Sequence, residues 1–222
     1  MKGKILTNKK RVFWEALFLT IVIFIFGMLI GISFESNKVE QIRQYYSYSE
    51  ASIMDVFASN NLIDLNSANC SVLENSNFEF ADRIYNEAVL LERYENSGKI
   101  TDGMILEHKK YDLLRTLLWI NEMKTSEKCG RNYSVVVYLY EYQPEDLAQK
   151  ATQNVWSKIL VDLKNKYGHD VLLIPIAIDS DLVSLNSLID KYEIENYPVL
   201  IIDNNEIVEK LSSVDDLDGY FN

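Results

Sequence analysis

The sequence lacks the features that most enzymes acting on thiols, metals or nucleotides require. It has only two cysteines, Cys70 and Cys129, and they form no Cys-x-x-Cys motif. Its two histidines, His108 and His169, fall on different predicted elements, so we expect no zinc site. There is no glycine-rich phosphate loop and no Gly-x-Ser-x-Gly elbow. We therefore predict no catalytic residues, no metal and no cofactor.

Basic residues are scarce after the first part of the chain. Five of the 22 Lys and Arg and one of the 33 Asp and Glu lie in residues 1–34, which leaves 17 basic against 32 acidic residues in 35–222. Proteins that bind nucleic acid neutralise its phosphates with Lys and Arg, so this balance argues against a nucleic-acid partner. The acidic excess favours a domain that is displayed in solution, or a partner that is basic or that Ca²⁺ bridges to the chain.

One long apolar run lies near the N-terminus. From Ala16 to Phe34 the chain has nineteen residues without a charge, and a helix of that length spans about 28 Å, close to the hydrocarbon thickness of a bilayer. We predict a transmembrane helix over 12–34 with Trp14 near its start. Five basic residues precede it, so the positive-inside rule places 1–11 in the cytoplasm and 35–222 outside, as in a single-pass signal-anchor protein of the cell membrane. A cleaved signal peptide is the alternative.

Residues 35–130 are predicted to form an extracytoplasmic α-helical region. Apolar spacing indicates one or two amphipathic helices over 38–65, weakened at Ser47, Ser49 and Ser52. A helix over about 78–94 and another from about Asp102 follow. Their connection is only a few residues long, so we expect the two to pair antiparallel.

The two cysteines bracket this helical pair. Outside the cytoplasm, two cysteines in one domain are usually paired, and closing the loop between Cys70 and Cys129 stabilises a fold by about 4 kcal/mol in the chain-entropy model. We favour a structural disulfide. A redox-active pair and two free buried cysteines are the alternatives.

After Gly130 the pattern changes from helical to extended, which predicts an α/β domain over 131–222. Clusters of β-branched and aromatic residues indicate strands, and apolar residues every three or four positions indicate helices. The expected order is strand 134–140, a helix from Pro144 to about Gly168, strand 171–178, helix 182–192, strand 198–203, a turn at Asn204-Asn205, strand 206–210 and helix 214–221. The first strand, helix and strand should form a right-handed parallel crossover.

This order of elements resembles the core of the thioredoxin fold over 132–222. Two local features add to the resemblance: the apolar strand Val-Val-Val-Tyr-Leu-Tyr leads into a turn and a long helix, and Tyr197-Pro198 opens the third strand. Thioredoxin-like proteins carry a cis-proline at that place, so the resemblance implies a cis Tyr197-Pro198 bond. The whole chain also looks like uncharacterised membrane-anchored thioredoxin-like proteins of small-genome archaea, in which an anchor and a helical region precede the domain.

The chain departs from the family at the reactive turn. Thioredoxin-like oxidoreductases place two cysteines, three residues apart, at the start of the first helix. Here those positions are Gln143 and Asp146, with Pro144 and Glu145 between them. Neither side chain exchanges thiols, so the reductase, oxidase and isomerase activities are excluded for this turn. We interpret the four residues as a helix start, with Pro in the first turn and acids near the helix dipole.

With thiol chemistry excluded at this turn, the function that the resemblance still implies is recognition of a partner. In the family, the residue before the cis-proline pairs through its main chain with an extended substrate. By this analogy the binding residues are Tyr140, Tyr142, Gln143, Tyr197 and Pro198. The alternative is that Tyr140 and Tyr197 are ordinary core or edge residues.

We therefore expect a membrane-anchored extracytoplasmic binding or scaffold protein, redox-inactive, with a protein or peptide partner. One rival is a thiol-disulfide oxidoreductase or chaperone component that acts through Cys70 and Cys129 or with the thiols of a partner. Another is that residues 36–130 carry the function through helix-helix assembly.

Overall fold

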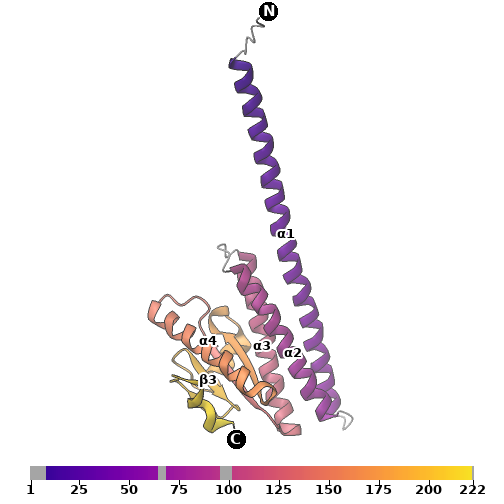
Figure 1. Ribbon diagram of the computed structural model, residues 1–222. Coiled ribbons are helices and arrows are strands. Elements are labelled where there is room, and N and C mark those ends of the chain that lie inside the picture. The colour runs from indigo at the N-terminus through magenta and orange to yellow at the C-terminus, as the bar shows by residue number, and fades with distance from the viewer. Residues whose placement is uncertain (1–8, 65–68, 96–101, 222) are drawn as a thin grey trace, which may run out of the picture. The chain divides into compact units, whose positions relative to one another are not determined.

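The computed structural model describes residues 9–64, 69–95 and 102–221 (Figure 1). These residues form an α/β protein with an N-terminal apolar helix, further helices and a small mixed sheet of four strands. The chain divides into two compact units, residues 1–44 and 45–222, and each is described by itself. Most of the predicted cytoplasmic tail, residues 1–8, lies outside the described residues.

The first helix, α1, runs from Lys9 to Asp64. Its segment Arg11–Ser33 is long and apolar enough to cross a membrane, and none of this segment is buried inside the protein. The weakening expected at Ser47, Ser49 and Ser52 does not interrupt the helix. Serine costs a helix only about half a kcal/mol relative to alanine, which is too little to end it.

Helices α2 (Cys70–Glu95) and α3 (Asp102–Cys129) lie side by side (Figure 1). A disulfide joins the first residue of α2 to the last residue of α3, with their Cα atoms 5.7 Å apart. The two helices are therefore antiparallel and bridged at their open ends, as predicted. The chain leaves α3 at Gly130, whose φ of +72° suits glycine and whose N–H bonds the Ser126 carbonyl at 3.0 Å.

The sheet has the strand order β2-β1-β3-β4. β1 pairs with β2 in parallel, β3 pairs with β1 antiparallel, and β4 pairs with β3 antiparallel. The strands are β1 (Ser134–Tyr140), β2 (Val171–Ala177), β3 (Val199–Ile202) and β4 (Glu206–Val208), and the helices that connect the first three are α4 (Leu147–Tyr167) and α5 (Val183–Lys191). The predicted elements are all present, and β4 is shorter than expected.

Three details near the C-terminus refine the predictions. The residues with positive φ between β3 and β4 are Asp203 and Asn204, so the tight turn begins one residue earlier than expected. The closing helix, η3 (Val214–Tyr220), is a 3₁₀ helix. The Tyr197-Pro198 peptide bond is cis, as the resemblance implies.

Both faces of the sheet are covered. On one face, α4 and η3 pack over alternate strand residues in a single cluster of Val136, Tyr138, Trp156, Ile159, Leu160, Leu163, Val171, Leu200, Ile202, Leu211 and Leu217. The other strand residues are equally buried, and α3, which contacts β2 and α5, lies on their side. α3 buries polar side chains as well as apolar ones, Asp112 and Glu122 among them, so two clusters of buried polar groups lie along it.

Candidate functional site

The residues predicted to bind a partner lie at one end of the sheet. β1 ends at Tyr140, and β3 starts directly after Pro198 and runs antiparallel to β1, so the start of β3 lies beside the end of β1. The turn 141–146 is therefore a neighbour of the Tyr197-Pro198 step. We call this end of the sheet the carboxyl edge, because β1 and β2 both finish there. It brings together all five predicted residues, Tyr140, Tyr142, Gln143, Tyr197 and Pro198.

Only some of the five reach the surface. Pro198 is buried. Tyr140 is half-buried and packs against the core cluster, where burial raises the pKa of its hydroxyl. Gln143 is exposed, and Tyr142 and Tyr197 are half-buried. The side chains of this set that a partner can touch are therefore Gln143 and, in part, the three tyrosines.

Side chains hold the turn after β1 from two directions. Gln153, on α4, donates through Nε2 to the carbonyl of Glu141 and accepts through Oε1 from the N–H of Glu141, both at 2.9 Å. The Asp179 carboxylate, which follows β2, accepts from the backbone N–H groups of Tyr142 at 2.9 Å and Gln143 at 3.1 Å. Three consecutive amides of the turn are therefore occupied within the protein.

The same turn ends in a helix cap. The Asp146 carboxylate accepts a 2.9 Å hydrogen bond from the N–H of Ala148, and α4 begins at Leu147. The cap interpretation is correct for Asp146, but the expectation of Pro144 in the first turn is wrong. An aspartate side chain can accept a hydrogen bond from a free amide of the first turn, and a proline side chain cannot. The helix therefore starts after Asp146 and not at Pro144. The cap also places a negative charge where a thiol enzyme needs to stabilise a thiolate.

A buried polar cluster on α3 lies at the carboxyl edge. The fully buried Asp112 carboxylate accepts from three donors: His108 Nδ1 at 2.9 Å, Arg115 Nη1 at 3.3 Å and the backbone N–H of Ala177, the last residue of β2, at 3.0 Å. The His108 ring stacks on the ring of Tyr142, with centres 3.8 Å apart. Both the end of β2 and the turn after β1 are therefore tied to α3.

This cluster was missed by sequence reasoning, which set His108 aside because no second histidine stands at a metal-ligand spacing. The available signal was the four-residue spacing of His108 and Asp112 on one helix face. An ionised carboxylate only accepts, so Nδ1 of His108 donates to Asp112. In the part of the chain that the structure describes, no three His, Cys, Asp or Glu side chains gather as metal ligands.

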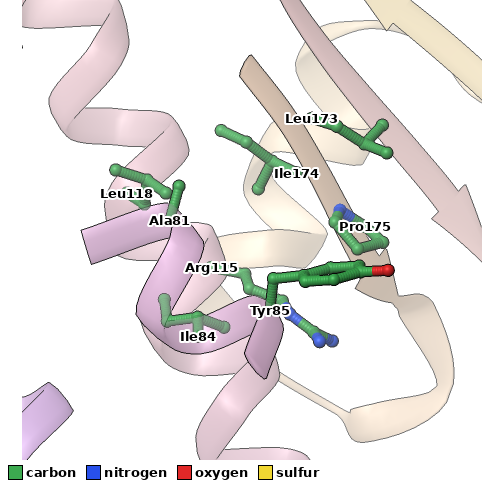
Figure 2. Close-up of a pocket in the computed structure, with 8 residues that line it drawn as sticks. All are labelled: Ala81, Ile84, Tyr85, Arg115, Leu118, Leu173, Ile174 and Pro175. Carbon is green, nitrogen blue, oxygen red and sulfur yellow. The ribbon is translucent and has the colours of Figure 1, made fainter. Parts of the chain in front are cut away.

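Figure 2 shows a small pocket beside Arg115, between α2, α3 and β2. Its lining residues are Ala81, Ile84, Tyr85, Arg115, Leu118, Leu173, Ile174 and Pro175. The guanidinium is the single charged group among them, and it already bonds Asp112. The pocket is therefore apolar around one neutralised cation, and its lining offers no pair of groups for acid-base or nucleophilic chemistry.

The disulfide is remote from the carboxyl edge. His108, which stacks on Tyr142, and Cys129 lie on the same helix, separated by about 30 Å at 1.5 Å per residue. The bridge to Cys70 closes the other end of the α2–α3 pair. The two sulfur atoms therefore cannot serve the turn at which a thioredoxin-like enzyme would hold its thiols.

A second buried acid lies on α3 toward the disulfide. The Glu122 carboxylate is fully buried and accepts a 2.8 Å hydrogen bond from the Tyr133 hydroxyl. Burial raises the pKa of Glu122 to about 7, although Tyr133, Asn77 and Arg131 act to lower it. Asn77 is itself buried and accepts a 2.9 Å hydrogen bond from Asn121. Burial therefore brings the pKa of this acid close to neutral pH.

Comparison with known proteins adds nothing to this geometry. No protein-family model, no characterised protein and no solved structure matches the chain. The functional argument therefore rests on the carboxyl edge itself, with its occupied turn, its exposed Gln143 and the buried Asp112 cluster.

Proposed function

We propose that the protein is a membrane-anchored binding or scaffold protein whose residues 131–222 form a thioredoxin-like domain without redox activity. The order β1-α4-β2-α5-β3-β4-η3 supports the domain assignment, since it is the order that the resemblance implies. The parallel β1–β2 pair and the antiparallel additions of β3 and β4 agree with it.

The observation that carries the proposal is the occupied turn after β1. A thiol enzyme needs a reactive sulfur there and free N–H groups or a helix dipole to stabilise its anion. This turn has Gln143 and Asp146 in place of the sulfurs, and its amides are bonded to Gln153 and Asp179. A turn that is chemically inert and held in one shape is suited to present a surface.

The anchoring part of the proposal is supported by Arg11–Ser33 and by the basic residues before it. Mass spectrometry of the mature chain distinguishes a retained anchor from a cleaved signal peptide. Protease treatment of intact cells tests the orientation: residues 45–222 should be digested from outside. Protection of these residues would reverse the proposed orientation.

The function is tested by two measurements on the full chain. Insulin reduction and oxidation of a reduced substrate should both show no turnover. A photo-crosslinking residue at Gln143 should capture a protein in native membranes, while the same residue at Asn132, exposed before β1, should not capture it. Turnover that disappears in the Cys70→Ser variant would instead identify a thiol-disulfide oxidoreductase.

A further inference from the structure

The carboxyl edge carries an excess of negative charge. β4 also ends there, because Val208 pairs with Leu200 near the start of β3. The four connections at this edge, 141–147, 178–183, 192–197 and 209–213, hold eight acidic side chains and one basic one, Lys210. One further ammonium group, that of Lys109 on α3, bonds the Asp181 carbonyl at 3.1 Å, so the acids still outnumber the bases. Such a surface attracts positive charge and repels anionic lipid.

The same edge exposes two large apolar side chains. Val183 is 83% exposed and Leu147 80%, the highest values for large hydrophobic residues in the described part of the chain. Each is the last residue of one of these connections and the first residue of a helix, α5 or α4. The hydrogen bonds of Asp179 to the turn after β1 hold the two connections together. Each of the two side chains offers apolar area that a bound partner can cover.

His108 supplies an independent sign of a ligand. The residue is only 9% exposed, yet Nε2 has no hydrogen-bond partner in the described residues. Nε2 lies across the ring from Nδ1, so it points away from Asp112. With Nδ1 bonded to Asp112, Nε2 is the ring nitrogen left for a polar group of a ligand.

We propose that the carboxyl edge binds a lysine- or arginine-bearing segment of a partner protein. Apolar side chains of that segment pack on Leu147 and Val183, and one of its polar groups hydrogen-bonds His108 Nε2. The inference rests on the proposed function and names the chemical class of its partner. Part of the attraction is electrostatic, so binding should weaken as salt is added.

The test uses the full chain in nanodiscs of phosphatidylcholine, which carries no net charge, and fluorescein-labelled peptides of repeated Lys-Val-Lys-Ser, Lys-Ser-Lys-Ser and Glu-Val-Glu-Ser units. The first peptide should bind best and the third not at all. The double variant Glu145→Lys/Glu195→Lys should weaken binding of the first peptide about tenfold. Its matched control, Asp170→Lys/Glu206→Lys, makes the same change of net charge at exposed residues directly before β2 and at the start of β4, at the opposite end of the strands, and should bind normally.

The apolar and hydrogen-bonding contacts have separate readouts. Leu147→Ser/Val183→Ser should reduce the preference for the valine-containing peptide over the serine one, whereas Val155→Ser/Val161→Ser, at exposed positions elsewhere on α4, should not. The ¹⁵N resonance of His108 Nε2 should shift when the first peptide saturates the protein. Equal weakening by both lysine variants, or an unshifted Nε2, would overturn the proposal.

Failure of the peptides can be told apart from failure of the proposed function. If none of the peptides binds but a residue at Gln143 still captures a protein, the edge is a binding surface for a partner of another class. If there is neither peptide binding nor capture, both the inference and the binding function are wrong.

Discussion

The Tyr133 hydroxyl donates a 2.8 Å hydrogen bond to one oxygen of the Glu122 carboxylate, while the other oxygen, Oε1, has no hydrogen-bond partner in the described residues. Arg131 is near enough to lower the pKa of Glu122, and Glu74 raises it, but burial outweighs both. A fully buried carboxylate with one neutral donor is poorly compensated for the water it has lost. Taking up a proton removes this cost, so Glu122 links the fold to pH.

Glu122→Gln should flatten the dependence of stability on pH. The pKa of Glu122 rises from its usual 4.5 to about 7 on folding, so the folded chain binds the proton more tightly than the unfolded one. The stability that this group contributes is then fully present below about pH 4.5 and is lost as pH rises to about 7. Between pH 5 and 8 this group alone should lower the free energy of unfolding by about 2–3 kcal/mol. Urea unfolding at both pH values, followed by tryptophan fluorescence, measures the change.

The exposed Glu127 on the same helix provides the control. Glu127→Gln should keep the pH dependence of the natural chain, because an exposed carboxyl group gains little from neutralisation. Equal slopes for the natural chain and the Glu122→Gln variant would show that Glu122 does not carry the linkage.

Asp179→Ala should release the turn after β1. The substitution removes the acceptor of two amides, those of Tyr142 and Gln143, and a lost hydrogen bond of a charged acceptor costs about 1.5–3 kcal/mol. Hydrogen exchange at these two amides should become faster, while exchange in the middle of β1 stays slow. Asp181→Asn is the control, since Asp181 contributes its carbonyl, not its carboxylate, to a bond with Lys109. Unchanged exchange at Tyr142 would mean that the turn is held by other contacts.

The sheet could be predicted because its signals are local. The runs Ser134–Tyr140 and Val171–Ala177 are β-branched and apolar, as strands buried on two faces must be, and their bounds were predicted within a residue. The ends of the helices were harder to predict. Whether Pro144 or Asp146 starts α4 depends on which side chain reaches a free amide, and the pattern of apolar residues does not contain that information.

The site itself was only partly predictable. The turn and the Tyr197-Pro198 step could be placed at one edge from the order of strands. The residues that hold the turn could not, because the side chain of Asp179 lies 36 residues from Gln143 and that of Asp112 lies 65 residues from Ala177. Contacts at such separation are set by how helices pack on the sheet, and periodicity in the sequence does not specify them.

Removing the disulfide should lower stability without changing the fold. Cys70 and Cys129 close a loop with a sequence separation of 59, for which the chain-entropy model predicts a loss of about 4 kcal/mol. The double variant Cys70→Ala/Cys129→Ala and the reduced natural chain should show the same decrease in urea unfolding. Their far-ultraviolet circular dichroism should be unchanged, since α2 and α3 also pack directly. A loss much smaller than this would mean that the unfolded chain is already compact there.

Asp112→Asn should be the most destabilising single substitution of the set. The asparagine keeps the shape of the side chain but removes the charge that compensates the buried Arg115 guanidinium, and breaking a buried ion pair costs about 3–5 kcal/mol. Asp162→Asn, at an exposed position of α4, should change the free energy of unfolding by less than about 0.5 kcal/mol.

A double-mutant cycle separates the charge pair from the rest of the Asp112 cluster. Once Asp112 is neutral, Arg115→Met removes a cation that no longer has a counter-charge, so the double variant should be more stable than the sum of the two single losses predicts, by about 1–3 kcal/mol. The bond from the Ala177 N–H should persist in part, because the amide oxygen of the introduced asparagine still accepts. If hydrogen exchange at the Ala177 amide stays slow while stability falls strongly, the loss comes from the broken ion pair. If exchange becomes fast, the loss comes from the hydrogen bond that joins α3 to β2.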